Sequence, residues 1–181
     1  MAQTEQKNQN VKKQFEELQA MALQTSMVLF EWDDETLAPK GAAEHTARVI
    51  GSLSEQYQEI LASMRFKELL DACQKAEKEN AGVFDEVQSA ILREAAEEQE
   101  RLSCIPPEEY RAYAELTARA TGIWTRAREK NDFASFAPVL KEIISYQKKF
   151  AAYRAKPGQK LYDVMLDTYE KGFNMEMLDP F

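Results

Sequence analysis

The sequence contains few of the residue types from which catalytic centres are built. Its one histidine is His45, and its two cysteines are Cys73 and Cys104. A catalytic zinc ion usually has three protein ligands, drawn from histidine, glutamate and cysteine. The pattern H-E-x-x-H, which pairs two histidine ligands with a general base on one helix, does not occur. The sequence therefore predicts no catalytic residue and no metal ligand in this chain.

Nucleophilic catalysis is equally hard to assemble from these residues. A catalytic triad would have to use His45, which lies among small and polar residues and which we expect at the surface or partly buried. No serine occupies a G-x-S-x-G turn, and no glycine-rich phosphate-binding loop is present. Cys73 and Cys104 have no paired spacing, so we expect reduced, largely buried thiols. The substrate-binding residues stay unknown at this level.

Carboxylates are plentiful, but their spacing favours structural roles. One group lies in the middle of an expected helix and predicts a solvated helix face: Glu94, Glu97, Glu98 and Glu100. A second group follows Trp32 at a break in the helical pattern: Asp33, Asp34 and Glu35. We interpret the second group as a turn whose carboxylates cap a helix.

The charge balance argues against several classes of partner. The 181 residues carry a formal net charge of −8, whereas nucleic-acid binding needs a basic surface that releases counterions from phosphates. Anionic lipid is disfavoured for the same reason. The first residues are polar, and no apolar run approaches the roughly 18 residues that span a bilayer. We therefore expect a cytoplasmic protein that binds neither nucleic acid nor membranes.

Helical periodicity dominates the rest of the sequence. An apolar stripe with steps of three and four residues predicts a first helix over about residues 5–32. Its members are Val11, Phe15, Leu18, Ala22, Thr25 and Leu29. Similar stripes predict a second helix over about 41–62, a third that Ser63 caps and that carries Cys73, and a fourth with Phe84, Val87, Ile91 and Leu102.

Prolines and capping residues define the remaining helices. Pro39 and the pair Pro106-Pro107 break the pattern, and Pro107 suits the first position of a fifth helix. Asp132 or Ser135 caps a sixth helix, and Pro138 falls in its first turn if Ser135 is the cap. A seventh helix over about 161–170 ends before Gly172, and one apolar turn follows at 173–178.

Together these patterns predict an all-α fold. We expect six to eight helices in an antiparallel, layered array that forms a single helical domain over residues 1–181. The buried face of the fifth helix is predicted to consist of Tyr110, Tyr113, Thr117, Ala120, Trp124 and Ala127. Trp124 lies on this stripe and is expected to be well buried. Because the last apolar turn begins a helix that the sequence does not finish, we expect a truncated chain.

Three segments resemble the carboxypeptidase Taq-like metallocarboxypeptidases. Residues 31–44 (EWDDETLAPKGAAE) are similar to the W-D-Q-E-T…M-P-x-G-A segment of that family. Residues 124–133 (WTRAREKNDF), followed by Phe136 and Pro138, resemble its W-x-x-A-R-x-x-N-D-F segment, and residues 162–172 (YDVMLDTYEKG) resemble Y-D-x-L-L-D-x-Y-E-P-G. The segments occur in the family's order and span essentially the whole chain. Ala38 and Lys171 depart from the usual methionine and proline.

The resemblance implies a longer enzyme. Members of the family are mostly helical, usually homodimeric, and use a metal, typically zinc, to remove single residues from the C-termini of peptides. Their H-E-x-x-H helix, third metal-binding glutamate and other signature motifs are absent here. No catalytic residue or metal ligand can therefore be assigned to this chain. The resemblance places it among the family's N-terminal helices, which form part of the wall over a deep substrate groove.

Two functional hypotheses follow. In the first, the chain is the N-terminal helical portion of a zinc carboxypeptidase and is inactive alone, so that peptide substrates bind only when it is joined to a catalytic part. In the second, it is a free-standing helical interaction module derived from that family. Exposed apolar residues also predict a homo-oligomer, and the expected places are Phe30, Trp32, Phe173, Met175, Met177, Leu178 and Phe181.

Overall fold

The computed structural model describes residues 2–33 and 40–180. Within these residues the chain forms eight α-helices, one short 3-10 helix and no strand. In chain order they are α1 (Ala2–Asp33), η1 (Lys40–Ala42), α2 (Ala43–Ala62), α3 (Met64–Glu79), α4 (Glu86–Ser103), α5 (Pro107–Glu129), α6 (Phe133–Arg154), α7 (Leu161–Tyr169) and α8 (Met175–Leu178). The predicted all-α fold is confirmed. The turn expected at Asp34, Glu35 and Pro39 lies outside the described residues.

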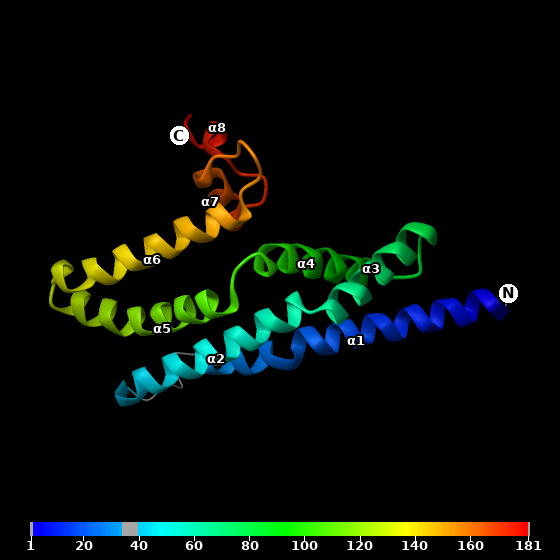
Figure 1. The fold of residues 1–181 in the computed structure, drawn as a ribbon, viewed down its shortest axis with the longest axis horizontal. Coiled ribbons are helices and arrows are strands. Elements are labelled where there is room, and N and C mark those ends of the chain that lie inside the picture. Colours follow the sequence, from blue (N-terminus) through cyan, green and yellow to red (C-terminus); the bar gives the residue numbers. More distant parts are fainter. Residues whose placement is uncertain (1, 34–39, 181) are drawn as a thin grey trace.

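The helices form an elongated array in which neighbours run in opposite directions (Figure 1). α2 folds back along α1 and lies between α1 and α5, and α6 folds back along α5. α3 and α4 form a second hairpin that packs on α1 and α2. α7 packs against α6, and α8 packs against α7. This arrangement agrees with the antiparallel, layered array predicted from the sequence.

The main hydrophobic core lies where α1, α3 and α4 meet. Phe66 of α3 is completely buried, and the ring of Phe15 in α1 lies 5.1 Å from that of Phe84, between centroids. Burial of each large apolar side chain contributes about 1.5–3 kcal/mol. The remaining members of this core include Val11, Leu18, Leu61, Leu69, Leu70, Cys73, Leu92 and Leu102. α1 contributes Val11, Phe15 and Leu18 to it, and Met21 and Ala22 pack against it while partly buried.

Side-chain caps fix where several helices begin. Ser63 accepts a hydrogen bond from the Phe66 amide, and Asn174 accepts one from the Met177 amide. Each bond satisfies a backbone donor that has no partner within the helix. The predicted cap at Ser63 is confirmed. Asp85 forms a capping box with Gln88, which places the start of α4 at Glu86.

The structure decides between the two N-caps that the sequence left open for α6. Asp132, rather than Ser135, is the N-cap, because its carboxylate accepts from the Ser135 amide and α6 begins at Phe133. Pro138 consequently lies in the second turn instead of the first. Its nitrogen carries no hydrogen and cannot donate to the carbonyl of Ala134, four residues earlier.

Small residues bring α2 and α5 close together. Ala47, Gly51 and Ser54 are buried along one face of α2, and Ala114 and Ala120 are buried on α5. A Cβ atom added to Gly51 would lie 2.2 Å from the Glu115 Cγ of α5. The close approach of the two helices therefore depends on the missing side chain at Gly51.

The prediction that Trp124 is well buried is wrong. Its side chain is 43% exposed, and the Arg128 guanidinium lies over its ring, 5.2 Å from the centroid. The contact with α2 uses the alanine side of α5, and Trp124 lies beside that contact instead of within it. The sequence pattern placed Trp124 on an apolar stripe, but it did not show whether the alanines or the aromatic side chains of α5 would be buried.

Two polar side chains tie the start of α5 to the neighbouring helices. Gln58 of α2 is buried, and its amide donates to the carbonyls of Leu102 (3.1 Å) and Ile105 (2.8 Å) at the break between α4 and α5. Arg154 of α6 donates through Nε to the Arg101 carbonyl, 3.1 Å away, in the last turn of α4. A cation there also interacts favourably with the helix dipole. These bonds hold α5 in place relative to α2, α4 and α6.

Other expectations for α4 are corrected by the structure. Phe84 is buried but precedes the helix, and Val87 is exposed because the Asp85 cap turns the first turn of α4 toward solvent. Glu94 and Glu100 are exposed, as a solvated face requires. Two other carboxylates of the row instead form ion pairs, Glu97 with Lys171 and Glu98 with Arg101.

The two cysteines have different environments. Cys73 is completely buried in the core, as predicted, and it is a free thiol. Cys104 is exposed, which contradicts the expectation that both cysteines are buried. It is the C-cap residue of α4, at the point where the chain leaves the helix and turns toward Pro106.

Candidate functional site

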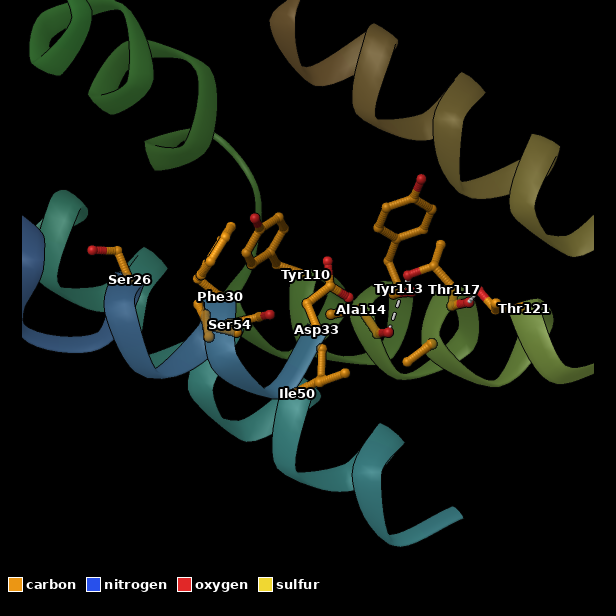
Figure 2. A pocket seen from close by; sticks show the side chains of 12 residues that line it. Ser26, Phe30, Asp33, Ile50, Ser54, Tyr110, Tyr113, Ala114, Thr117 and Thr121 are labelled. Atoms are coloured by element: carbon orange, nitrogen blue, oxygen red, sulfur yellow. Dashed lines mark hydrogen bonds between the residues drawn. The ribbon is translucent and has the colours of Figure 1, made fainter. Parts of the chain in front are cut away.

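A hollow of about 570 Å³ lies between the C-terminal half of α1, α2 and α5. Figure 2 shows that its lining side chains come from these three helices. The lining residues are Ser26, Leu29, Phe30 and Asp33 from α1, Ile50 and Ser54 from α2, and Tyr110, Tyr113, Ala114, Thr117, Ala118 and Thr121 from α5.

The α1 wall of the hollow is formed where this helix leaves the core. Val11, Phe15 and Leu18 are buried against α3 and α4, but beyond Leu18 the predicted stripe is covered only in part. Thr25 is buried, whereas Phe30 is largely exposed at the edge of the hollow. One amphipathic pattern thus continues along α1, but its first residues pack in the core and its last residues line the hollow.

The α5 wall is a row of hydroxyl groups and aromatic rings. The Tyr113 ring packs edge-on against Phe150 of α6, with centroids 5.2 Å apart, and its hydroxyl accepts from the Gln147 amide. The Thr117 hydroxyl donates to the Ala114 carbonyl (3.0 Å), and the Thr121 hydroxyl donates to the Thr117 carbonyl (3.4 Å). Because these threonine protons are used within α5, their oxygens can act only as acceptors toward a group in the hollow.

The electrostatics of the hollow suit binding rather than proton transfer. Burial raises the pKa of Tyr110, and the nearby Glu98 carboxylate raises it further. Burial also raises the pKa of Tyr113. Both phenols are therefore neutral near pH 7, and Asp33 supplies the one carboxylate among the lining residues. The lining residues include no histidine, no cysteine and no pair of carboxylates.

The part of the chain that the structure describes does not fit a metal centre. No group of three histidine, cysteine, aspartate or glutamate side chains is arranged there to hold a metal ion. His45 is exposed, and its ring lies edge-on to Trp32 with centroids 6.0 Å apart. His45 therefore lies at the surface, as expected.

Sequence reasoning left the binding residues unknown and missed the hollow. Tyr110, Tyr113 and Thr117 were interpreted as the buried face of the fifth helix. The structure leaves them half-buried, with one side open to the hollow. A recognisable signal was available, because hydroxyl side chains recur along this stripe where a core-facing helix would carry leucine or isoleucine.

Comparison with known proteins identifies the family. The sequence model of the carboxypeptidase Taq (M32) metallopeptidases matches residues 10–181. The chain belongs to this family. The resemblance drawn from the three sequence segments is thereby confirmed.

Individual M32 relatives are identical to this chain at about a third of the aligned positions. It is 34% identical over 154 residues to carboxypeptidase 1 of Bacillus subtilis (strain 168), and this match covers 85% of the chain and 30% of that relative. It is 33% identical over 141 residues to thermostable carboxypeptidase 1 of Pyrococcus furiosus, covering 78% of the chain and 27% of that relative. The chain thus spans about a third of the length of the M32 relatives that it matches.

A solved M32 structure has the same arrangement of helices. The crystal structure of a protein named BsuCP aligns with a TM-score of 0.79 and 32% sequence identity, over 94% of this chain and 33% of that protein. The helical array described above therefore corresponds to about a third of the BsuCP structure. None of the helices described in this chain is both long and apolar enough to cross a lipid bilayer.

Proposed function

We propose that this chain is the N-terminal helical portion of a metal-dependent carboxypeptidase that, as a whole, removes residues from the C-termini of peptides. The observation that carries the proposal is the match of residues 10–181 to M32 metallopeptidases, joined to coverage of only a third of the aligned relative. Residues 1–181 would act as one helical unit that supports the peptidase without supplying its chemistry.

The proposed metal is zinc, held by residues outside this chain. The described residues offer no cluster of metal ligands. His45 is exposed, and a single histidine cannot supply the three protein ligands that a catalytic zinc ion usually has. When bound elsewhere in the enzyme, zinc would polarise the scissile carbonyl or activate a water molecule. The chain's own contribution is to position the helices around that centre and to limit the access of water and substrate to it.

Peptide substrates would meet this chain only when the catalytic part is present. The hollow offers neutral phenols, hydroxyl acceptors and the Asp33 carboxylate, which are suited to hold polar atoms in place. The hydroxyl groups that line it have no histidine or carboxylate pair beside them to activate a nucleophile, so the isolated chain is expected to be inactive.

A second candidate function is a free-standing helical interaction module. It is favoured by the exposed apolar side chains Leu23, Met27 and Phe30 on α1, since such patches usually mark interaction surfaces. The coding sequence after Phe181 discriminates the two candidates. A continuing reading frame with H-E-x-x-H supports the peptidase portion, and a natural stop in related genes supports the module.

We also propose that the isolated chain forms a homo-oligomer. Phe30, Trp32 and Met177 are exposed, and Phe173, Met175 and Leu178 are half-buried; Phe181 lies outside the described residues.

The net charge of −8 supports the further proposal that neither nucleic acid nor anionic membranes are partners. Free thiols at Cys73 and Cys104 fit a reducing compartment, which supports a cytoplasmic location.

The proposal is tested on the isolated chain by metal analysis and a peptidase assay. After dialysis against a chelator and then against zinc, the chain should retain no stoichiometric zinc and should release no C-terminal residue from a peptide. Stoichiometric zinc together with turnover that depends on chain concentration would contradict it. Carboxypeptidase 1 of Bacillus subtilis, treated in parallel, serves as the positive control.

A further inference from the structure

The second half of α1 differs from the first half in charge. Residues 5–17 include six charged side chains: Glu5, Lys7, Lys12, Lys13, Glu16 and Glu17. Residues 18–30 (LQAMALQTSMVLF) include none, although several of their side chains are exposed. An exposed helix without charges is unusual for a solvated surface, where Lys and Glu normally dominate.

Three apolar residues form a continuous stripe along this uncharged half. Leu23, Met27 and Phe30 are spaced by four and three residues, so they share one face of α1. Their exposed fractions are 55%, 57% and 76%. Single exposed apolar residues need no explanation, but a contiguous row of them marks a contact surface. We call these three residues the α1 stripe.

The α1 stripe adjoins the hollow. Phe30 belongs to both, and Asp33, one turn further along α1, contributes a carboxylate to the lining (Figure 2). The combined surface therefore has an apolar ridge, a concave floor with phenol and threonine oxygens, and a negative charge at one end. A partner that fits it needs an apolar helix face, and it needs hydrogen-bond donors or a basic side chain opposite Asp33.

The length of the relatives indicates what this partner is. BsuCP aligns with 94% of this chain, yet only a third of BsuCP is covered, so an M32 protein contains about twice as much polypeptide again that must pack against such helices. A second copy of this chain is the weaker occupant. Each copy carries a net charge of −8, so two copies repel one another when they approach.

We propose that the α1 stripe and the adjoining hollow form a packing surface. The polypeptide that packs on it is the part of an M32 protein that lies outside the region matched by this chain. This inference rests on the proposed function, because it identifies the surface through which the helical portion supports the peptidase. Self-association of the isolated chain then reflects the same apolar surface when its own partner is absent.

The test uses a full-length chimera. The matched third of Bacillus subtilis carboxypeptidase 1 is replaced by this chain, and the double variant Met27→Gln/Phe30→Gln is compared with Val87→Gln. Glutamine is a good helix former, so the substitutions remove apolar contact without breaking the helix. Val87 is a matched control, because it is 68% exposed and lies on α4, away from the hollow.

In the isolated chain both variants should unfold within about 2 °C of the parent, because the substituted side chains are exposed. In the chimera the double variant should lower the unfolding temperature by at least about 4 °C, whereas Val87→Gln should not. Equal effects of the two variants in the chimera would overturn the proposal. A chimera that does not fold with the unmutated chain would overturn it too, since the surface would then reject the relative's polypeptide.

A second measurement separates the competing occupant. If light scattering shows a dimer of the isolated chain that the double variant converts to a monomer, while the chimera is unaffected by that variant, then a second copy is the occupant and the proposal is wrong. Peptidase activity of the unmutated chimera reports on the proposed function alone. The proposal about the α1 stripe can therefore be wrong while the proposed function is correct. The proposed function can also be wrong while the proposal about the α1 stripe is correct, and the two measurements distinguish these outcomes.

Discussion

Burial at single positions decides which aromatic residues stabilise the fold. Phe66 is completely buried among α1, α3 and α4, so Phe66→Ala should lower the free energy of unfolding by about 3–5 kcal/mol. Trp124 is 43% exposed, so Trp124→Ala should cost less than half as much, despite the larger ring. Urea denaturation of both variants provides the comparison. Equal losses would mean that the Trp124 side chain is packed in a core.

One buried and one half-buried acid, Cys73 and Tyr57, make stability depend on alkaline pH. Burial raises the pKa of the Cys73 thiol from 9.0 to about 11. Burial, and next the Glu98 carboxylate, raise the pKa of Tyr57 from 10.0 to about 12. Because both values are higher in the folded state, the neutral forms stabilise it. That contribution is complete below about pH 9 and is lost as the pH rises from about 9 to 12.

The free energy of unfolding should accordingly fall over this range, and Cys73→Ala should flatten the fall between about pH 9 and 11. Cys104→Ala is the matched control, because Cys104 is exposed and should leave the profile unchanged. Urea denaturation at a series of pH values measures both profiles. A Cys73→Ala profile as steep as that of the parent would show that this thiol does not contribute.

At the scale of helices, the contact between α2 and α5 depends on the absence of a side chain at Gly51. Replacement of an exposed helical glycine by alanine normally stabilises a helix by about 0.5–1 kcal/mol. Gly122→Ala in α5 should show this gain, because only the Arg126 guanidinium lies near, at 3.6 Å. Gly51→Ala should not show this gain in stability, because the added Cβ would clash with the Glu115 Cγ.

Glu115 cannot move without cost, because its carboxylate forms ion pairs with Arg111 (3.0 Å) and Arg119 (3.6 Å) on α5. Thermal unfolding of the two variants measures the difference. The account requires Gly122→Ala to unfold at the higher temperature. Equal stabilisation by both substitutions would show that α2 and α5 are not held as closely as the structure places them.

The helices themselves were largely predictable, because their signals are local. The cap at Ser63, the start of α5 at Pro107 and the helical periods all depend on residues within a turn or two of one another. The contacts between helices were not predictable in the same way. Trp124 and Cys104 were misplaced because their burial depends on which face of a distant helix lies opposite.

The candidate site was less predictable than the fold. The hollow combines residues of α1, α2 and α5 that are separated by up to 95 positions, from Ser26 to Thr121. No pattern within one helix specifies such a meeting. The absence of an H-E-x-x-H motif, by contrast, could be read directly from the sequence, and family membership followed from three local segments.

At the scale of the whole molecule, the chain corresponds to one part of the longer M32 proteins that it matches. It covers about a third of BsuCP, and its described residues include no cluster of metal ligands. Its long helices are closely packed at Gly51 and are tied together by hydrogen bonds of Gln58 and Arg154. The exposed α1 stripe is where these helices would meet the remainder of the enzyme.

The most direct test of this account is the peptidase activity of the chimera in which this chain replaces the matched third of Bacillus subtilis carboxypeptidase 1. The account predicts release of C-terminal residues from a peptide, loss of that release on treatment with a chelator, and recovery when zinc is restored. A chimera that folds and binds zinc but releases no residue would contradict the claim that this chain is the supporting helical portion of a metallocarboxypeptidase.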